Sequence, residues 1–232
     1  EVSAKLRQEL QDRLKRAGVD TAFVEVIAGA SGHAIIQVNR AGENSIILHG
    51  GANRAITPAD ADRVVREFTA GDYLLLQNEI SAIPQIMKRA AAAGLKIVLN
   101  PAPMGRQLLR YPLKLVSCFI LNEIEGGGLT GQKEPGRILA AMMRQYPAAA
   151  TVLTLGARGA MYGKAGQVMK APAVRVKPVD TTAAGDTFIG YFLADRAAGR
   201  DVETALRTAC QAAAICVTRP GAADSIPRRS EV

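Results

Sequence analysis

The chain has 232 residues, of which 48% are hydrophobic and 22% are charged, the composition of an ordinary folded protein. This length is enough for one large domain with a small appendage. A transmembrane helix needs about 20 consecutive apolar residues, and no run in the sequence is that long. The cysteines Cys118, Cys210 and Cys216 show no metal-ligand spacing, which favours reduced thiols in a cytoplasmic protein.

The net charge of +8 is compatible with a nucleic acid or with a small anionic substrate. The basic residues are scattered along the chain, aromatic residues make up only 4% and tryptophan is absent. Single-stranded nucleic acids are bound by aromatic side chains interleaved with basic ones, and no such pattern is present. We therefore expect neither a nucleic-acid partner nor a membrane.

The first part of the chain predicts a helix followed by a small sheet. Leucines at helical spacing predict a helix over residues 4–17, which ends at Gly18. Residues 40–44 are typical of a hairpin turn between two of the strands that follow. Strands are predicted at 23–27, 33–39 and 45–49. Because they precede any alternation of strands and helices, we expect a separate small sheet over 21–49.

From Thr57 onward, helices and strands alternate. Thr57, Pro58 and Asp60 are the N-cap, N1 and N3 residues of a helix start. Strands are predicted at 73–77 (a buried one), 96–100, 115–122, 150–156, 160–163, 168–172 and 174–179. Further helices are predicted at 82–93, 135–145, 186–198 and 201–218. The alternation predicts an α/β fold, with a parallel sheet covered by helices on both faces.

Polar residues follow several of these strands where they end. In open α/β sheets, ligands bind at the carboxyl ends of the strands. The candidates are Asn78, Glu79, Asn100, Asn122, Glu125, and the stretches 154–159 and 180–186. Each of these signals is weak alone, but their recurrence at one edge of one sheet indicates a site.

The stretch 180–186, "DTTAAGD", places Asp186 and several very small residues at a predicted helix start. A helix N-terminus exposes unpaired N–H groups and attracts anions, and small residues allow close approach. Asp186 is therefore either a helix cap or a group that faces a bound substrate. His33 and His49 lie in the predicted hairpin, and the sequence contains neither a Ser-His-Asp set nor a zinc pattern.

The segment "DTTAAGDTFIGYF" at 180–192 resembles the C-terminal signature of the ribokinase-type (PfkB) carbohydrate kinases. Other segments resemble that family in the same order: "GENSIILHGGANRAITP" (42–58), "QNE" (77–79), "LNPAP" (99–103), "NEIE" (122–125), "TLGARG" (154–159) and "VTRPGAADSIPRRSEV" (217–232). The resemblance implies a three-layer α/β/α sandwich with a mostly parallel central sheet. It further implies a core formed by 1–20 and 50–232, and a small β lid formed by 21–49.

The resemblance also implies an activity, the ATP-dependent phosphorylation of ribose to ribose 5-phosphate. Deoxyribose is the nearest rival substrate, followed by other sugars and nucleosides. A truncated relic that binds a nucleotide without catalysis is the alternative from a different class. We expect ATP and a pentose as ligands, Mg²⁺ and K⁺ as cofactors, and a homodimer formed through the lid.

Site residues follow from the same resemblance, position by position. Asp186 matches the catalytic base and contacts the sugar together with Glu79, while Glu125 is associated with Mg²⁺. The anion hole matches Ala183, Ala184, Gly185 and the amide of Asp186. The ATP-binding positions are Asn122, Thr154, Gly156, Gly159, Gly185 and Cys210. The K⁺ positions are Asp180, Thr182, Cys216, Arg219, Gly221 and Ser225.

The sequence departs from the family pattern in three places. "EGGGLTG" follows Asn122-x-x-Glu125 where a charged helix is usual, and Cys210 stands where His or Asn is expected. The family's first strand, with its sugar-binding Asp, and the Gly-Gly segment that closes over the sugar have no counterpart in this chain. We expect them to be missing from this chain rather than from the gene, and sugar binding to suffer more than nucleotide binding.

Overall fold

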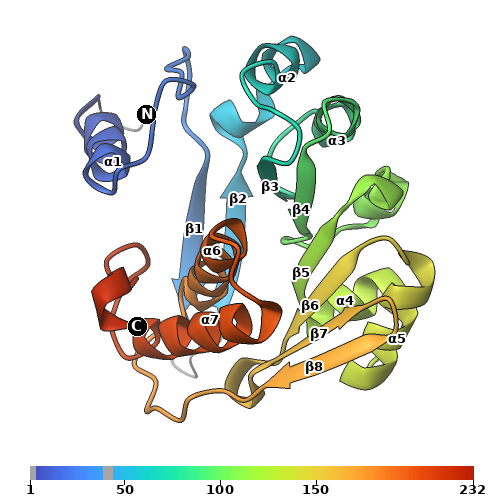
Figure 1. Cartoon of the computed structure of the whole chain (residues 1–232). Helices are drawn as coiled ribbons and strands as arrows, with labels where there is room; N and C mark the ends of the chain where they lie inside the picture. The colour runs from blue at the N-terminus through green and yellow to red at the C-terminus, as the bar shows by residue number, and fades with distance from the viewer. Residues whose placement is uncertain (1–3, 39–43) are drawn as a thin grey trace.

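The computed structural model describes residues 4–38 and 44–232. Its main sheet has six strands in the order β3-β4-β5-β6-β7-β8 (Figure 1). Their bounds are β3 (Tyr73–Gln77), β4 (Lys96–Asn100), β5 (Cys118–Asn122), β6 (Ala150–Thr154), β7 (Ala160–Lys164) and β8 (Gln167–Ala171). Strands β3 to β6 are parallel, and β7 and β8 continue the sheet antiparallel. The prediction of a mostly parallel α/β sheet is confirmed.

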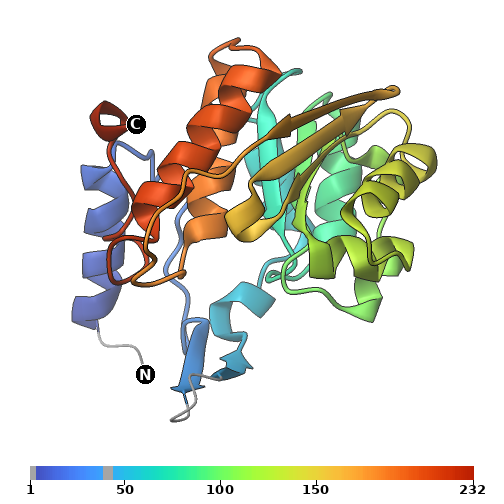
Figure 2. The same ribbon diagram turned by 90° about the horizontal axis from the view of Figure 1, so that it is seen from below.

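Helices cover both faces of this sheet (Figure 2). The α-helices are α1 (Ala4–Arg16), α2 (Pro58–Val65), α3 (Ile83–Ala92), α4 (Glu123–Thr130), α5 (Pro135–Gln145), α6 (Ala184–Ala197) and α7 (Val202–Cys216). Short 3-10 turns lie at Gly51–Arg54, Arg106–Arg110, Leu113–Leu115, Gly156–Arg158 and Arg229–Glu231. Within the described part of the chain, none of the helices combines the length and the apolar character that crossing a bilayer would require.

Two apolar cores result from the alternation of side chains along the strands. Ile97, Leu99 and Phe119 belong to the core that also contains the buried residues of α2, α3 and α5. Val98 and Ile120, one position along from these residues, pack with α6 and α7 on the opposite face. The near-continuous apolar sequence of β4 and β5 is what a strand buried on both faces requires.

A separate antiparallel ribbon consists of β1 (His33–Val38) and β2 (Asn44–His49), with His33 opposite His49. The predicted hairpin pairing is confirmed, although most of the predicted turn lies outside the described residues. The predicted strand at 23–27 is wrong. Its β-branched and aromatic residues suit a strand, but no neighbouring strand is paired with it among the described residues, and its side chains are exposed.

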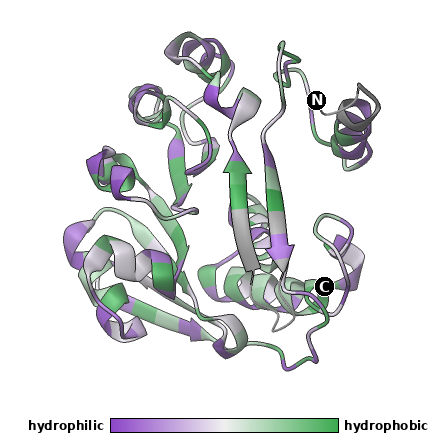
Figure 3. Cartoon of the chain, turned by 180° about the vertical axis from the view of Figure 1, so that it is seen from behind, coloured by the Kyte–Doolittle hydropathy of each residue, from purple (hydrophilic) through white to green (hydrophobic). Residues whose placement is uncertain are grey.

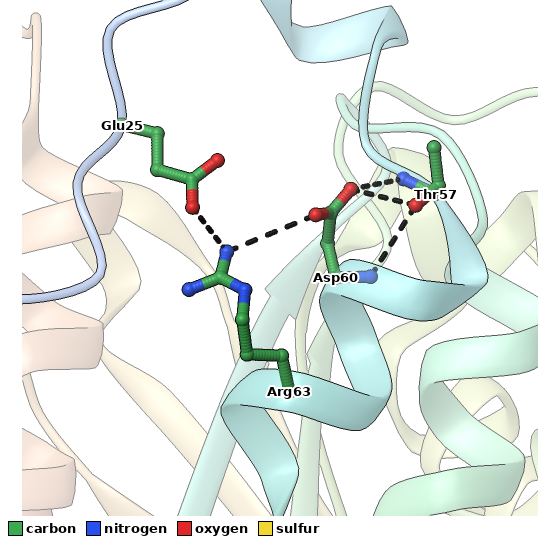
Figure 4. A network of polar contacts seen from close by, with 4 residues as sticks. All are labelled: Glu25, Thr57, Asp60 and Arg63. Carbon is green, nitrogen blue, oxygen red and sulfur yellow. Dashed lines mark hydrogen bonds and ion pairs between the residues drawn. The ribbon is translucent and has the colours of Figure 1, made fainter.

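The segment 23–27 instead lies against α2, held by polar and aromatic contacts. Arg63 on α2 pairs with both Glu25 and Asp60 (Figure 4). The predicted cap of α2 is confirmed, because the Asp60 N–H donates to Thr57 Oγ1 at 3.3 Å and the Thr57 N–H donates to Asp60 Oδ2 at 2.9 Å. Hydrogen bonds from Thr57 hold the pKa of Asp60 below its usual value. Phe23 also packs on Phe68.

Three other strand predictions need correction. Strand β3, predicted to be buried, is an edge strand, and Leu75 is 44% exposed because no strand lies beyond it within the described part of the chain. Strand β5 begins at Cys118 rather than at 115, since a 3-10 turn occupies Leu113–Leu115. Residues 174–179 form no strand, and they line a pocket described below.

Candidate active site

The N-terminus of α6 lies at the carboxyl edge of the parallel strands. The helix begins at Ala184, and its N-cap residue Ala183 has a left-handed backbone with φ of 61°. A left-handed residue followed by helical ones turns successive N–H groups into one concavity, which is a binding site for anions. In the described residues no acceptor engages the N–H groups of Gly185 and Asp186. These two N–H groups belong to residues of the predicted anion hole, and they are free of intramolecular partners in the described residues.

Asp186 occupies the third position of α6, and its side chain points to the sheet rather than to its own helix. Its Oδ1 accepts a hydrogen bond from Gln77 Nε2 at 3.1 Å. Gln77 is the last residue of β3. No helix N–H donates to the carboxylate in the part of the chain that is described. Of the two alternatives for Asp186, the geometry favours the group that faces a substrate over the helix cap.

A chain of polar side chains continues from Gln77 across the sheet edge. Gln77 Nε2 also donates to Asn100 Oδ1 at 3.0 Å. Asn100 Nδ2 donates to Glu125 Oε2 at 3.3 Å and to the Ile120 carbonyl at 2.9 Å. These hydrogen bonds connect the carboxyl ends of β3, β4 and β5. The three ends lie side by side because the strands are parallel and in register.

Glu125 is buried at the far end of this chain, with only 7% of its surface exposed. It forms a capping box with Asn122, whose N–H and Nδ2 both donate to its carboxylate. Burial raises the pKa of Glu125, and the hydrogen bonds from Asn122 and Asn100 only partly oppose that shift. The glycines that replace the family's charged helix here are part of α4, so Glu125 keeps a regular helical position.

Beside the α6 N-terminus is a pocket of about 630 Å³. Five of the predicted ATP-binding residues line it, namely Thr154, Gly156, Gly159, Gly185 and Cys210. Gly159 has φ of 93°, and a Cβ atom there would lie 2.1 Å from the Ala171 carbonyl oxygen, so no other residue fits. Burial raises the pKa of the Cys210 thiol to about 11, so this thiol is neutral at pH 7.

The rest of the pocket wall was missed by the sequence analysis. It comes from the loop before α6 and from the end of α7, and most of its residues are apolar: Val174, Val176, Ala213, Ala214 and Val217, with Arg175 as a charged member. The signal in the sequence was the group of small residues at 209, 210 and 212–214, which lets other groups approach this side of α7 closely. Strand propensity in 174–176 hid the role of the loop. A mostly apolar pocket of this kind suits a nucleobase.

Two predicted residues lie away from this pocket. Asn122 is not among its lining residues and caps α4 instead. Glu79 is exposed on the turn after β3 and makes no hydrogen bond or ion pair with any described residue. Its neighbour Asn78 has a structural role, because it donates to the Pro103 carbonyl at 2.7 Å and accepts from the Tyr111 hydroxyl at 2.9 Å.

Five of the six predicted cation-binding residues meet behind the α6 N-terminus. Asp180 accepts hydrogen bonds from the N–H groups of Thr182 and Gly221, which hold its pKa below the usual value. The Sγ of Cys216 lies 3.1 Å from the Oγ of Ser225, which is fully buried. Arg219 is turned away from this group and pairs with Glu231. In the described residues no three His, Cys, Asp or Glu side chains form a metal cluster.

Known proteins are similar to this chain in both sequence and fold. Residues 4–229 match the family described as pfkB family carbohydrate kinase. Ribokinase from Haemophilus influenzae is 34% identical over 99% of the chain and 77% of its own length. Deoxyribokinase from Salmonella typhi is 33% identical over 92% of the chain and 72% of its length. The structure of Arabidopsis thaliana ribokinase complexed with ribose and ATP superposes with a TM-score of 0.75 and 30% identity, covering 88% of this chain and 68% of that one.

These matches in sequence and fold show that the chain belongs to the pfkB family of carbohydrate kinases. Proteins of this class are phosphotransferases with an alcohol group as acceptor, and this chain is one of them. The resemblance inferred from the sequence is confirmed.

Burial of Glu125 leads to a prediction about stability and pH. Its pKa is raised above the ordinary 4.5 in the folded chain, so the folded chain binds the proton more tightly than the unfolded one. Stability from this group is therefore full below pH 4.5 and decreases as the pH rises through the folded value. We expect the unfolding free energy of the wild type, minus that of Glu125→Gln, to decrease from pH 4.5 to pH 7 in urea titrations without divalent cations.

The matched control is Asp201→Asn. Asp201 caps α7, and hydrogen bonds from Thr204 lower its pKa below 3.8. The corresponding difference for Asp201→Asn should therefore stay constant from pH 4.5 to pH 7. If the difference in unfolding free energy between the wild type and Glu125→Gln is also constant over this pH range, burial does not raise the pKa of Glu125 as proposed.

Proposed function

We propose that this chain catalyses the transfer of the γ-phosphoryl group of ATP to the terminal hydroxyl of a pentose, with ribose giving ribose 5-phosphate. The observation that supports it most is Asp186, which stands between the apolar pocket and the polar sheet edge at a helix start with free N–H groups. Deoxyribose is the second candidate, because a deoxyribokinase is among the relatives. The three free cysteines support a cytoplasmic location.

The proposed mechanism uses groups of this chain for positioning and for one proton transfer. The nucleobase lies in the apolar pocket, and the phosphates reach the N–H groups of Gly185 and Asp186. The carboxylate of Asp186 accepts the proton of the sugar hydroxyl as its oxygen attacks the γ-phosphorus. The bond from phosphorus to the β–γ bridging oxygen breaks, and ADP leaves. Charge that develops on the moving phosphoryl group is stabilised by the helix N-terminus.

The residues of this site fit Mg²⁺ only when the ion is bound to the phosphates of the nucleotide. Glu125 Oε2 already accepts two hydrogen bonds and Oε1 accepts one, so its carboxylate is not open to an ion in the way a dedicated site would be. Mg²⁺ is commonly held by substrate phosphates and water, with one or two carboxylates. We propose that Mg²⁺ would bind together with ATP and would neutralise charge on its phosphates. Glu125 would hold the ion through a bridging water molecule.

The role of Asp186 is tested with Asp186→Asn, which keeps the size of the side chain but cannot take a proton at neutral pH. We expect kcat with ATP and ribose to fall by about 10²–10⁴-fold, the usual contribution of a general base. ATP affinity in calorimetry should change little, because the pocket is intact. Asp224→Asn, at an exposed ion pair with Arg13, is the matched control. An Asp186→Asn variant that keeps most of its kcat would remove the proposed role.

The substrate is tested by measuring ADP release with ribose, 2-deoxyribose, fructose and adenosine. Ribose should give the highest kcat/KM. Nucleotide binding without turnover of any of the four would favour the relic that only binds a nucleotide.

A monovalent cation is the second proposed cofactor. The segments around Asp180 and around Cys216 to Ser225 are held together by hydrogen bonds just before α6. A K⁺ ion on carbonyl oxygens of these segments would order the start of α6. We expect the rate of ADP formation to be higher in KCl than in NaCl at equal ionic strength. Equal rates in the two salts would contradict this part of the proposal.

The ribbon of β1 and β2 is proposed to be a lid over the sugar site and the contact of a homodimer. The ribbon of these two strands carries the green of hydrophobic residues over part of its length in Figure 3, and Ile35, Ile47 and Leu48 are 53%, 56% and 57% exposed. Two strands alone are marginally stable, and apolar surface of this kind marks an interface. Residues 21–49 would form the lid, with 1–20 and 50–232 as the core.

The dimer is tested with Ile47→Lys, which places a charge opposite Ile35. In sedimentation velocity we expect a dimer for the wild type and a monomer for the variant. Val168→Lys on β8, which is 50% exposed, is the matched control and should remain dimeric. A monomeric wild type at high concentration would contradict the proposal.

A further inference from the structure

The two amide side chains between Asp186 and Glu125 have orientations that the network dictates. Asn100 directs Nδ2 at two acceptors, the Ile120 carbonyl and the Glu125 carboxylate, so its Oδ1 faces Gln77. Gln77 must then present its own Nε2 to Asn100, at 3.0 Å. The second N–H of that amide points to Asp186 Oδ1, at 3.1 Å.

This arrangement has a consequence for the carboxylate of Asp186. The side chain is exposed, and its hydrogen bond to Gln77 is the only one it makes with any described residue. A free aspartate on a helix rotates among several rotamers. The bond to Gln77 selects one of them, in which Oδ1 is engaged and Oδ2 remains open. An amide carries no charge and does not titrate, so Gln77 does this at every pH.

We propose that Gln77 is a positioning residue for the phosphotransfer: it holds the Asp186 carboxylate so that Oδ2 faces the sugar hydroxyl. The proposal rests on the proposed function of Asp186 as base. Reactions of bound groups depend strongly on orientation, and a misplacement of about 1 Å costs about 100-fold in rate. Buried Asn100 supports Gln77 from behind, since its own amide is fixed by β5 and α4.

Two variants separate this role from simple packing. Gln77→Met keeps the length of the side chain but removes both donors. Gln77→Glu keeps the shape but turns an acceptor toward the oxygens of Asp186 and Asn100. We expect kcat with ATP and ribose to fall by about 10- to 100-fold in Gln77→Met, and further in Gln77→Glu. The KM for ATP should stay within about two-fold, because Gln77 does not line the nucleotide pocket.

Gln85→Met is the matched control, since Gln85 is exposed on α3 and takes no part in the site. Its kcat should equal that of the wild type. A kcat unchanged in Gln77→Met, or reduced equally in Gln85→Met, would overturn the proposal.

A double-mutant cycle tests the contact without any turnover. Urea unfolding of the wild type, Gln77→Met, Asp186→Ala and the double variant gives the coupling between the two side chains. We expect a coupling of about 3- to 10-fold in the unfolding equilibrium constant, as for an exposed hydrogen bond to a charged group. If the two side chains show no coupling, the proposal for Gln77 is overturned, whatever turnover the variants show. If the wild type phosphorylates no sugar, the proposed function fails, and the coupling alone then decides whether Gln77 holds Asp186.

Discussion

The hydrogen bond from Gln77 to Asp186 joins the two halves of the site, because it connects the edge of the parallel sheet to the first turn of α6. Parallel strands all end at one edge, so their last side chains lie side by side wherever the strands are in register. Helix α6 packs on one face of the same sheet through Phe188 and Phe192. Its N-terminus is thereby fixed beside that edge, and its free N–H groups and the carboxylate share one location.

The left-handed residue Ala183 stores strain at this point. An alanine at φ of 61° is less favourable than a glycine, which adopts that region freely. The conformation is maintained because Thr187 N–H donates to the Ala183 carbonyl at 2.8 Å and α6 continues from it into the core. Strain of this kind concentrates at sites that bind ligands, and here it shapes the concavity of N–H groups.

The polar and the apolar surfaces of the site lie on different sides of the α6 N-terminus. On the sheet side, two neutral amides lie between two carboxylates, so Glu125 and Asp186 are linked without a direct contact between like charges. On the other side, the pocket wall consists mostly of small apolar residues of α7 together with Val174 and Val176, and Arg175 is its charged member. A ligand with an apolar base and an anionic tail matches this division, because each part meets the surface that suits it.

Features that depend on neighbouring residues in the chain could be predicted from the sequence. The cap at Thr57 and Asp60, the apolar strands β4 to β6 and the small residues before Asp186 each depend on neighbours a few positions away, and each is confirmed. The resemblance to the family rested on the same short segments. A pattern of this type predicts which residues begin a helix or fill a strand, because propensity and capping act over about four residues.

Tertiary structure decided what depends on partners far along the chain. Residues 23–27 and 174–179 have strand patterns but no strand beside them among the described residues, so the first lies against α2 and the second lines the pocket. Leu75 of β3 is exposed for the same reason, since burial of a strand depends on its neighbours and not only on its own sequence. The contact between Gln77 and Asp186 spans 109 positions, and only the folding of α6 onto the sheet brings the two side chains together.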